Sequence, residues 1–319
     1  MIEVKNLTKR YGNHLAVDHL NFTVESGKIY GFLGPNGAGK STTMNIMTGY
    51  LGATEGQVLI DGHDILQEPE EAKKNIGYLP EIPPLYMEMT VLEYLEFAAE
   101  LKGIKKDKRE PQIEEVIRLA KLRDVENRLI QNLSKGYKQR VGLAQAVLGF
   151  PEIIILDEPT VGLDPKQIIE IRELIRKLAK KHTVILSSHI LAEVREVCDY
   201  IMIISGGKLV ASDTTENLEN MMSGKGQIEV EAKASRDEMD HIIRRTGKIK
   251  EVKYRTSASG ITTAQIIAKG GEDIREELFL AFSHADVPML TLNQSKTTLE
   301  EIFLELTQGS GNRMIKEEK

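Results

Sequence analysis

The sequence contains a single cysteine and no long hydrophobic run. One thiol cannot close a disulfide within the chain, so nothing here indicates an oxidising compartment, and we expect Cys198 to be a small buried apolar residue. The longest apolar runs, such as Ile153–Leu156, fall far short of the roughly 18 residues that a membrane-spanning helix needs. Residues 1–10 lack the apolar core of a signal peptide. We therefore expect any role at a membrane to depend on a partner protein.

An excess of positive charge is also missing. The 42 Lys and Arg residues face 48 Asp and Glu residues, which gives a net charge of −6. A mildly acidic chain has no bulk electrostatic reason to coat nucleic acid or an anionic membrane, although a local basic patch stays open. The 41% of hydrophobic residues is typical of a folded protein with a real core. The 319 residues predict one large domain and a smaller one.

The first domain is expected over residues 1–222, where strand-like and helix-like segments alternate as in an α/β domain. Ile153–Leu156 is apolar on both faces, as a central parallel strand should be, and residues 183–187 form a similar run. Between about residues 85 and 150, apolar residues recur at helical spacing. We therefore expect a helical subdomain inserted into the α/β domain.

A second, smaller domain is expected over residues 227–308, after a Gly- and Ser-containing linker at 221–226. Its pattern predicts elements in the order β-α-β-β-α-β, which is typical of a small α+β module of the ferredoxin-like type. Two overlapping capping boxes predict the start of a last helix over 299–306. The polar tail at 309–319 is expected to be disordered.

A Gly-rich segment at 34–41 reads Gly-Pro-Asn-Gly-Ala-Gly-Lys-Ser and matches the phosphate-loop pattern in full. Its glycines let successive N–H groups point at phosphate oxygens, and the helix that follows adds its positive end. Lys40 can reach the β- and γ-phosphates, and Ser41 offers a hydroxyl to Mg²⁺. The sequence thus predicts an ATP site with Mg²⁺. The expected nucleotide-binding residues here are Gly34, Asn36, Gly37, Ala38, Gly39, Lys40, Ser41 and Thr42.

Two adjacent carboxylates, Asp157 and Glu158, directly follow the buried strand. Such a pair is costly there unless it binds something, and ligands of open α/β sheets sit at this end of the strands. We expect Asp157 to hold Mg²⁺ through water and Glu158 to polarise the attacking water. A solvated loop or a helix-cap acid is the alternative for the pair alone, and the nearby phosphate loop disfavours it.

Taken together, residues 1 to about 215 resemble the nucleotide-binding subunit of ABC transporters. Residues 133–137, Leu-Ser-Lys-Gly-Tyr, resemble the family's signature sequence LSGGQ, with Lys135 in place of Gly and Tyr137 in place of Gln. The two residues that matter most for the γ-phosphate, Ser134 and Gly136, are present. The resemblance therefore implies that both bind nucleotide.

Three further positions carry the same resemblance. Asp164, within Gly-Leu-Asp-Pro, looks like the residue of a loop that contacts the opposite subunit and its nucleotide. His189 looks like the switch histidine that touches the γ-phosphate, so the resemblance implies a catalytic role. Tyr11 stands where an aromatic ring stacks on adenine. Together with the phosphate loop, the signature and the acid pair, these residues follow one another in the family's order.

A narrower resemblance is to the single-domain ATPases of ABC-2 type export systems, including the gliding-motility-like branch. Glu81 stands where most ABC ATPases carry Gln, and that branch similarly tends to carry Glu. A carboxylate at Glu81 is implied to approach Mg²⁺ or the attacking water, as a catalytic or metal-binding residue, while adding negative charge near the phosphates. The segment 298–303 and a small C-terminal domain also resemble that branch.

The family resemblance also implies a mechanism. In the family, signature and phosphate loop meet only across a head-to-tail dimer, with ATP between the two subunits. Ser134 of one subunit would complete the site that Lys40 and Glu158 build in the other. The pair, a homodimer or a heterodimer, would close on ATP and open after hydrolysis. It would pass this motion to a separate integral-membrane permease near Glu81 and the helical insert.

These points predict the ATP-hydrolysing motor subunit of an exporter, cytoplasmic and held on the inner face of the cell membrane through its permease. The alternative is a soluble ABC ATPase that acts on nucleic acid or ribosomes. Such proteins usually carry two ATPase domains or a long coiled coil, whereas this chain has one phosphate loop and no sustained heptads. No nucleic acid is therefore expected as a partner. A third possibility gives the C-terminal domain a regulatory role, as a small-ligand or dimerisation module, which its fold alone does not decide.

Overall fold

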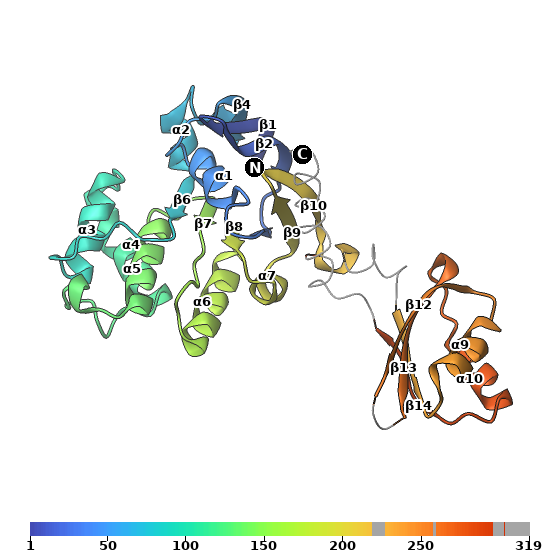
Figure 1. The fold of residues 1–319 in the computed structure, drawn as a ribbon. Coiled ribbons are helices and arrows are strands. Elements are labelled where there is room, and N and C mark those ends of the chain that lie inside the picture. Colours follow the sequence, from blue (N-terminus) through green and yellow to red (C-terminus); the bar gives the residue numbers. More distant parts are fainter. Residues whose placement is uncertain (219–226, 258–259, 296–302, 304–319) are drawn as a thin grey trace. The chain divides into compact units, whose positions relative to one another are not determined.

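Residues 1–218, 227–257, 260–295 and 303 are described in the computed structural model. They divide into two units, one over Met1–Thr215 and one within Glu216–Glu305, and each is treated by itself (Figure 1). The expected linker at 221–226 and tail at 309–319 lie outside the described residues. So does the expected helix at 299–306, apart from Phe303, which is helical.

A six-stranded sheet forms the centre of the first unit, in the order β10-β9-β3-β8-β7-β6. All neighbouring strands pair in parallel except β9 and β10, which form an antiparallel hairpin. Strands β3, β7 and β8 are buried along their whole length, as the apolar sequences of β3 and β7 and the Val184–Leu186 segment of β8 lead one to expect. The strands are β3 (Ile29–Leu33), β6 (Ile76–Leu79), β7 (Ile153–Leu156), β8 (Thr183–Ser188), β9 (Tyr200–Ser205) and β10 (Lys208–Thr214).

A second, antiparallel sheet joins the same unit in the order β2-β1-β4-β5. Its apolar side chains share one core with those of the central sheet, among them Leu20, Phe32 and Ile155. Met44 of α1 belongs to this core too, so the helix after the phosphate loop is anchored by residues of both sheets. The elements are β1 (Ile2–Tyr11), β2 (His14–Val24), α1 (Lys40–Met47), β4 (Glu55–Ile60) and β5 (His63–Asp64).

The expected helical insert is present as a cluster of helices set beside the sheets (Figure 1). Thr90 begins it with a capping box, in which its hydroxyl accepts from the Glu93 N–H while the Glu93 carboxylate accepts from the Thr90 N–H. The signature helix α5 belongs to this cluster and begins directly after Ser134. The helices are α3 (Val91–Leu101), α4 (Lys106–Leu119), η1 (Ile130–Asn132) and α5 (Lys135–Val147).

Three more helices flank the central sheet: α2 (Pro69–Lys74), α6 (Pro165–Leu178) and α7 (Leu191–Val197). Asp164 caps α6, because its carboxylate accepts from the Gln167 N–H at 2.9 Å, and Pro165 fits the first helical position. Since α6 follows β7 and α7 follows β8, the loops at the carboxyl ends of these paired strands lie next to each other.

The C-terminal unit has the expected β-α-β-β-α-β order and one antiparallel sheet, β12-β13-β11-β14. Its two helices cover one face of that sheet, where Ile242, Leu278 and Phe282 join a separate core (Figure 1). This arrangement is the ferredoxin-like topology that the sequence pattern predicts. Its elements are β11 (Gln227–Ala232), α9 (Arg236–Arg244), β12 (Ile249–Thr256), β13 (Thr262–Ala268), η2 (Lys269–Gly271), α10 (Arg275–His284) and β14 (Met289–Ser295).

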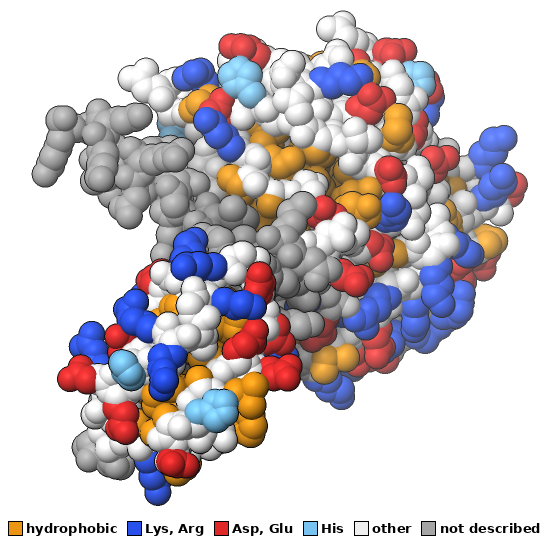
Figure 2. Space-filling view, turned by 90° about the vertical axis from the view of Figure 1, so that its right-hand side faces the viewer, with side chains coloured by type: hydrophobic (Ala, Val, Ile, Leu, Met, Phe, Trp, Pro, Cys, Tyr) orange, Lys and Arg blue, Asp and Glu red, His pale blue; other side chains and the backbone are white. Residues whose placement is uncertain are grey.

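The surface carries charges of both signs. Figure 2 shows Lys and Arg side chains interspersed with Asp and Glu over the visible face.

In the described part of the chain, no helix combines the length and the apolar character needed to cross a membrane.

Candidate nucleotide-binding site

The loop between β3 and α1 is shaped by two glycines that no other residue could replace without strain. A Cβ at Gly34 would lie 2.4 Å from the Ile204 carbonyl oxygen. Gly39, the residue before α1, has a φ of 103°, and a Cβ there would lie 2.5 Å from the Ala16 carbonyl oxygen. The loop therefore packs its backbone directly on neighbouring strands, as expected for a phosphate loop.

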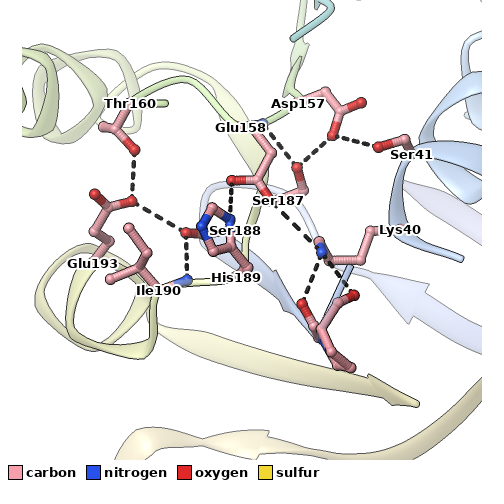
Figure 3. A network of polar contacts seen from close by, with 12 residues as sticks. Lys40, Ser41, Asp157, Glu158, Thr160, Ser187, Ser188, His189, Ile190 and Glu193 are labelled. Atoms are coloured by element: carbon pink, nitrogen blue, oxygen red, sulfur yellow. Dashed lines mark hydrogen bonds and ion pairs between the residues drawn. The ribbon is translucent and has the colours of Figure 1, made fainter. Parts of the chain in front are cut away.

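Lys40 is a buried lysine, 5% exposed, whose ammonium group lies across this loop. Its Nζ donates to the carbonyl oxygens of Gly34 at 2.7 Å and Pro35 at 3.2 Å. The same Nζ lies 3.6 Å from Glu158 Oε1 (Figure 3). The Lys40 ammonium group thus contacts both the loop carbonyls and Glu158. It lies near the N-terminus of α1, which is the positive end of the helix dipole.

The acid pair lies at the carboxyl end of β7 and is tied to the phosphate loop. Asp157 Oδ1 accepts from the Ser41 hydroxyl at 3.2 Å and from the Ser187 hydroxyl at 2.5 Å. Ser187 Oγ also accepts from the Glu158 N–H at 2.8 Å, so one hydroxyl holds both acids. Glu158 adopts a positive φ of 48°, an uncommon and strained backbone for a non-glycine residue.

His189, at the end of β8, faces this acid pair. Its Nδ1 lies 3.0 Å from Glu158 Oε2, and its side chain is 41% exposed (Figure 3). The structure therefore brings together Lys40, Ser41, Asp157, Glu158 and His189, which are far apart in the sequence. Ser187 is a member of the cluster that the motifs do not indicate. Its place at the end of the strand next to β7 is the signal that could have found it.

A cavity of about 530 Å³ opens over the phosphate loop. Tyr11 lines it and is 49% exposed, and Lys9 Nζ lies over its ring, 5.3 Å from the centre. His14, Ala16 and Val161 also line the cavity, and the motifs do not predict them. The predicted residues that line it are Tyr11, Asn36, Gly37, Gly39, Lys40, Ser41, Thr42, Glu81, Glu158 and His189.

Glu81 follows β6 and lines two cavities, the one over the phosphate loop and a second of about 810 Å³. Ser41 lines both cavities as well, whereas Asp157 lines only the second one. Tyr78, beside Glu81, donates its hydroxyl to Asn45 Oδ1 at 2.9 Å, and burial raises the pKa of this phenol, so it stays neutral. Residues of the helix after the phosphate loop and of the helical insert both line the second cavity. Glu81 lies in the wall that this cavity shares with the one over the phosphate loop.

The signature residues lie outside the 530 Å³ cavity, and so does Asp164. Ser134 caps α5, accepting from the Tyr137 N–H at 3.4 Å. A Cβ at Gly136 would lie 2.5 Å from the Gln167 side chain, so α5 begins directly against the start of α6, which Asp164 caps. Within one chain, Ser134, Gly136 and Asp164 therefore form a second group, separate from the phosphate loop.

The two departures from the signature pattern have different surroundings. Tyr137 donates its hydroxyl to Asp124 at 2.6 Å, and this hydrogen bond raises the pKa of the phenol. Its ring lies under Arg140, 5.9 Å from the guanidinium carbon. Lys135 is exposed, and its Nζ would lie 2.1 Å from a Cβ at Gly162, so it rests on the turn before Asp164. Both side chains thus hold the start of α5 in place.

Comparison with known proteins agrees with this geometry. Residues 17–161 match the ABC transporter family. The chain is 42% identical over 221 residues to the bacitracin transport ATP-binding protein BcrA of Bacillus licheniformis, covering 69% of this chain and 71% of that protein. It is 34% identical over 229 residues to the lantibiotic transport ATP-binding protein SrtF of Streptococcus pyogenes, covering 70% of this chain and 97% of that protein.

Solved structures give the same answer. The ATP-binding subunit of an ABC transporter superposes with a TM-score of 0.64 at 32% identity, covering 69% of this chain and 92% of that one. A dimeric ATP-binding cassette in a post-hydrolysis state, bound to ADP and Pi, superposes with a TM-score of 0.61 at 29% identity, covering 67% and 98%. With a phosphate loop, Glu158 and a histidine around one cavity, the chain belongs to the ATP-binding subunits of the ABC transporter family and is an ATP hydrolase.

Proposed function

We propose that this chain is the motor of a membrane exporter: two ATPase subunits close on ATP, hydrolyse it and drive a separate integral-membrane permease. One observation carries the proposal. The phosphate loop, Glu158 and His189 surround one cavity, whereas Ser134, Gly136 and Asp164 lie outside it. A site divided in this way is completed by a second subunit. The relatives named for bacitracin and lantibiotic transport support an export role.

Lys40, Glu158 and His189 have distinct proposed roles at ATP. Lys40 exchanges its bonds to the loop carbonyls for bonds to the β- and γ-phosphates, which are better partners for an ammonium group. Glu158, in reach of the same phosphate, orients and polarises the attacking water. His189 touches the γ-phosphate and stays bonded to Glu158. Catalysis then consists of positioning and electrostatic stabilisation of the transferred phosphoryl group. Tyr11 stacks on the adenine ring.

Mg²⁺ is the proposed second cofactor, and the residues present fit it. Ser41 Oγ and Asp157 Oδ1 lie 3.2 Å apart, so a hydroxyl and a carboxylate oxygen, both hard ligands, face one position. Within the described residues, no group of three or more Asp, Glu, His or Cys side chains could hold a metal ion unaided. This pattern suits Mg²⁺, which usually binds through one or two protein groups plus substrate phosphates. Glu81 is proposed to approach it as a further carboxylate.

A dimer of two copies is the proposed active form. Ser134 at the start of α5 and Asp164 at the start of α6 are exposed, beside the buried Gly136, and would be reached by a partner's ATP. The Glu158→Gln variant should bind ATP, fail to hydrolyse it and accumulate as a dimer in size-exclusion chromatography with light scattering. Lys40→Ala should stay monomeric under the same conditions. A Glu158→Gln variant that stays monomeric with saturating Mg²⁺ and ATP would contradict the dimer.

The 810 Å³ cavity is the proposed docking place of the permease. It borders the ATP site through Glu81, and Tyr50 and Ile82 on its rim are 82% and 83% exposed. Docking there would place the chain on the inner, cytoplasmic face of the cell membrane. We assign the ATPase to residues 1–222, with the helical subdomain at about 85–150, and an accessory role to 227–308.

Co-purification tests the partner. The native chain should be recovered with a polytopic membrane protein from detergent extracts, and an Ile82→Asp variant should be recovered alone while keeping its ATPase. Recovery with ribosomes or DNA instead would favour the alternative, an ABC ATPase that acts on nucleic acid.

A further inference from the structure

Glu193 is a buried carboxylate that the proposed mechanism does not use. It lies in the first turn of α7 and is 6% exposed. Its Oε2 accepts hydrogen bonds from the Thr160 hydroxyl at 2.6 Å and from the Ser188 hydroxyl at 3.1 Å (Figure 3). Within the described part of the chain, no Lys, Arg or His forms an ion pair with it. Burying a carboxyl group is costly unless it is hydrogen-bonded, and these two hydroxyls supply such bonds.

The two donors belong to two different loops of the ATP site. Thr160 follows Glu158 in the loop after β7, and its carbonyl oxygen accepts from the Leu163 N–H at 3.2 Å, at the turn that leads to Asp164. Ser188 ends β8 and directly precedes His189. One carboxylate oxygen therefore connects the loop that carries Glu158 and Asp164 to the loop that carries His189.

Ser188 fixes the backbone on both sides of His189. Its Oγ donates to Glu193 and accepts from the Ile190 N–H at 3.0 Å. The imidazole itself is 41% exposed and has only Glu158 as a hydrogen-bond partner among the described residues. Its position therefore depends on the backbone between Ser188 and Ile190, and through it on Glu193.

We propose that Glu193 is a positioning residue, which sets His189 in a fixed relation to Glu158. It touches neither nucleotide nor water, and it acts by holding Thr160 and Ser188 together. The inference rests on the roles proposed above for His189 and Glu158. The role of Glu193 differs from that of Ser187, whose hydroxyl forms hydrogen bonds with Asp157 and Glu158 directly. Loss of Glu193 would leave both acids in place and let His189 move.

Two matched pairs of variants in the full chain test this role. Thr160→Val removes the donor with little change in volume, and Thr160→Ser keeps it. Glu193→Ala removes the acceptor, and Glu193→Gln keeps an oxygen that both hydroxyls can reach. Because a displaced catalytic group slows the chemical step, we expect Thr160→Val and Glu193→Ala to lower kcat about tenfold. The KM for ATP should change less than about twofold, since the phosphate loop is untouched. Thr160→Ser and Glu193→Gln should keep nearly native values.

A double-variant cycle separates positioning from general destabilisation. His189→Ala should lower kcat, and adding Thr160→Val to it should cause no further loss, because both changes disable the same histidine. Losses that multiply in the double variant, or a native kcat in Thr160→Val, would overturn the inference and leave the proposed function intact. A native kcat in His189→Ala would contradict the role of the histidine itself, and the inference with it.

Discussion

The Lys40 ammonium nitrogen lies 3.6 Å from Glu158 Oε1, and both side chains are less than a tenth exposed. These residues come from the phosphate loop and from the end of β7, 118 positions apart by number (158 − 40). The contact joins the group proposed to hold phosphate to the group proposed to activate water. Because the two proposed roles differ, replacing Lys40 is expected to impair ATP binding, and replacing Glu158 is expected to impair hydrolysis.

Replacing Glu158 by Gln should abolish turnover while sparing ATP binding. The amide keeps the size of the side chain but is a poor acceptor for the proton of the attacking water, so kcat should fall by about 10²- to 10⁴-fold. Steady-state phosphate release and fluorescent-nucleotide titration measure the two properties. Glu152→Gln, an exposed position next to β7, is the control and should hydrolyse ATP at the native rate. Near-native turnover in Glu158→Gln would remove this residue from catalysis.

Replacing Lys40 by Ala should weaken nucleotide binding itself. Loss of charge-assisted bonds to the phosphates should raise the Kd for ATP at least about tenfold, since each such bond is worth about 1.5–3 kcal/mol. The change also leaves Glu158 buried without its cation, so the Tm should fall. Lys40→Met keeps the aliphatic stem and separates lost charge from lost packing. Calorimetric titration with ATP checks the affinity, and an unchanged Kd in both variants would refute the assignment.

Gly39→Ala should be more damaging than Gly37→Ala. Both glycines have positive φ, 103° and 79°, so alanine costs about 1–2 kcal/mol at either place. Only at Gly39 would the new Cβ also meet a backbone atom, the Ala16 carbonyl oxygen at 2.5 Å, whereas at Gly37 nothing lies within 4 Å. Thermal unfolding and ATP affinity should both separate the two variants. Equal losses would show that the close approach of the loop to β2 is unimportant.

Cys198 should react slowly in the folded protein. The thiol is 8% exposed, and burial raises its pKa, so the thiolate fraction at pH 8 is far below that of a free cysteine. Titration with a disulfide reagent should show one thiol only after denaturant is added. Fast labelling of the native chain would place Cys198 at an accessible surface instead.

The local motifs could be identified from the sequence because their physics is local. A phosphate loop is a contiguous segment, and its glycines, Lys40 and Ser41 specify its shape and charge without help from distant residues. Ile153–Leu156 predicts a central strand because all of its side chains are apolar, so both faces of the strand can be buried. Strands β1 and β2 are not predicted from the sequence pattern. Register shifts after Val4 and Leu7 and a positive φ at Asn6 and His19 interrupt the two-residue alternation that indicates a strand.

By itself, the sequence determined the main chemical groups of the ATP site, the alternation of strands and helices after the phosphate loop, and the expectation of two units. Only the tertiary structure decided which groups meet. Ser187 reaches Asp157, and Glu193 joins Thr160 to Ser188, because β7 and β8 pair in parallel and bring their carboxyl ends to one edge. The same folding leaves Ser134 and Asp164 together outside the cavity, since α5 and α6 begin side by side. Contacts between residues tens of positions apart depend on strand order, which no local pattern encodes.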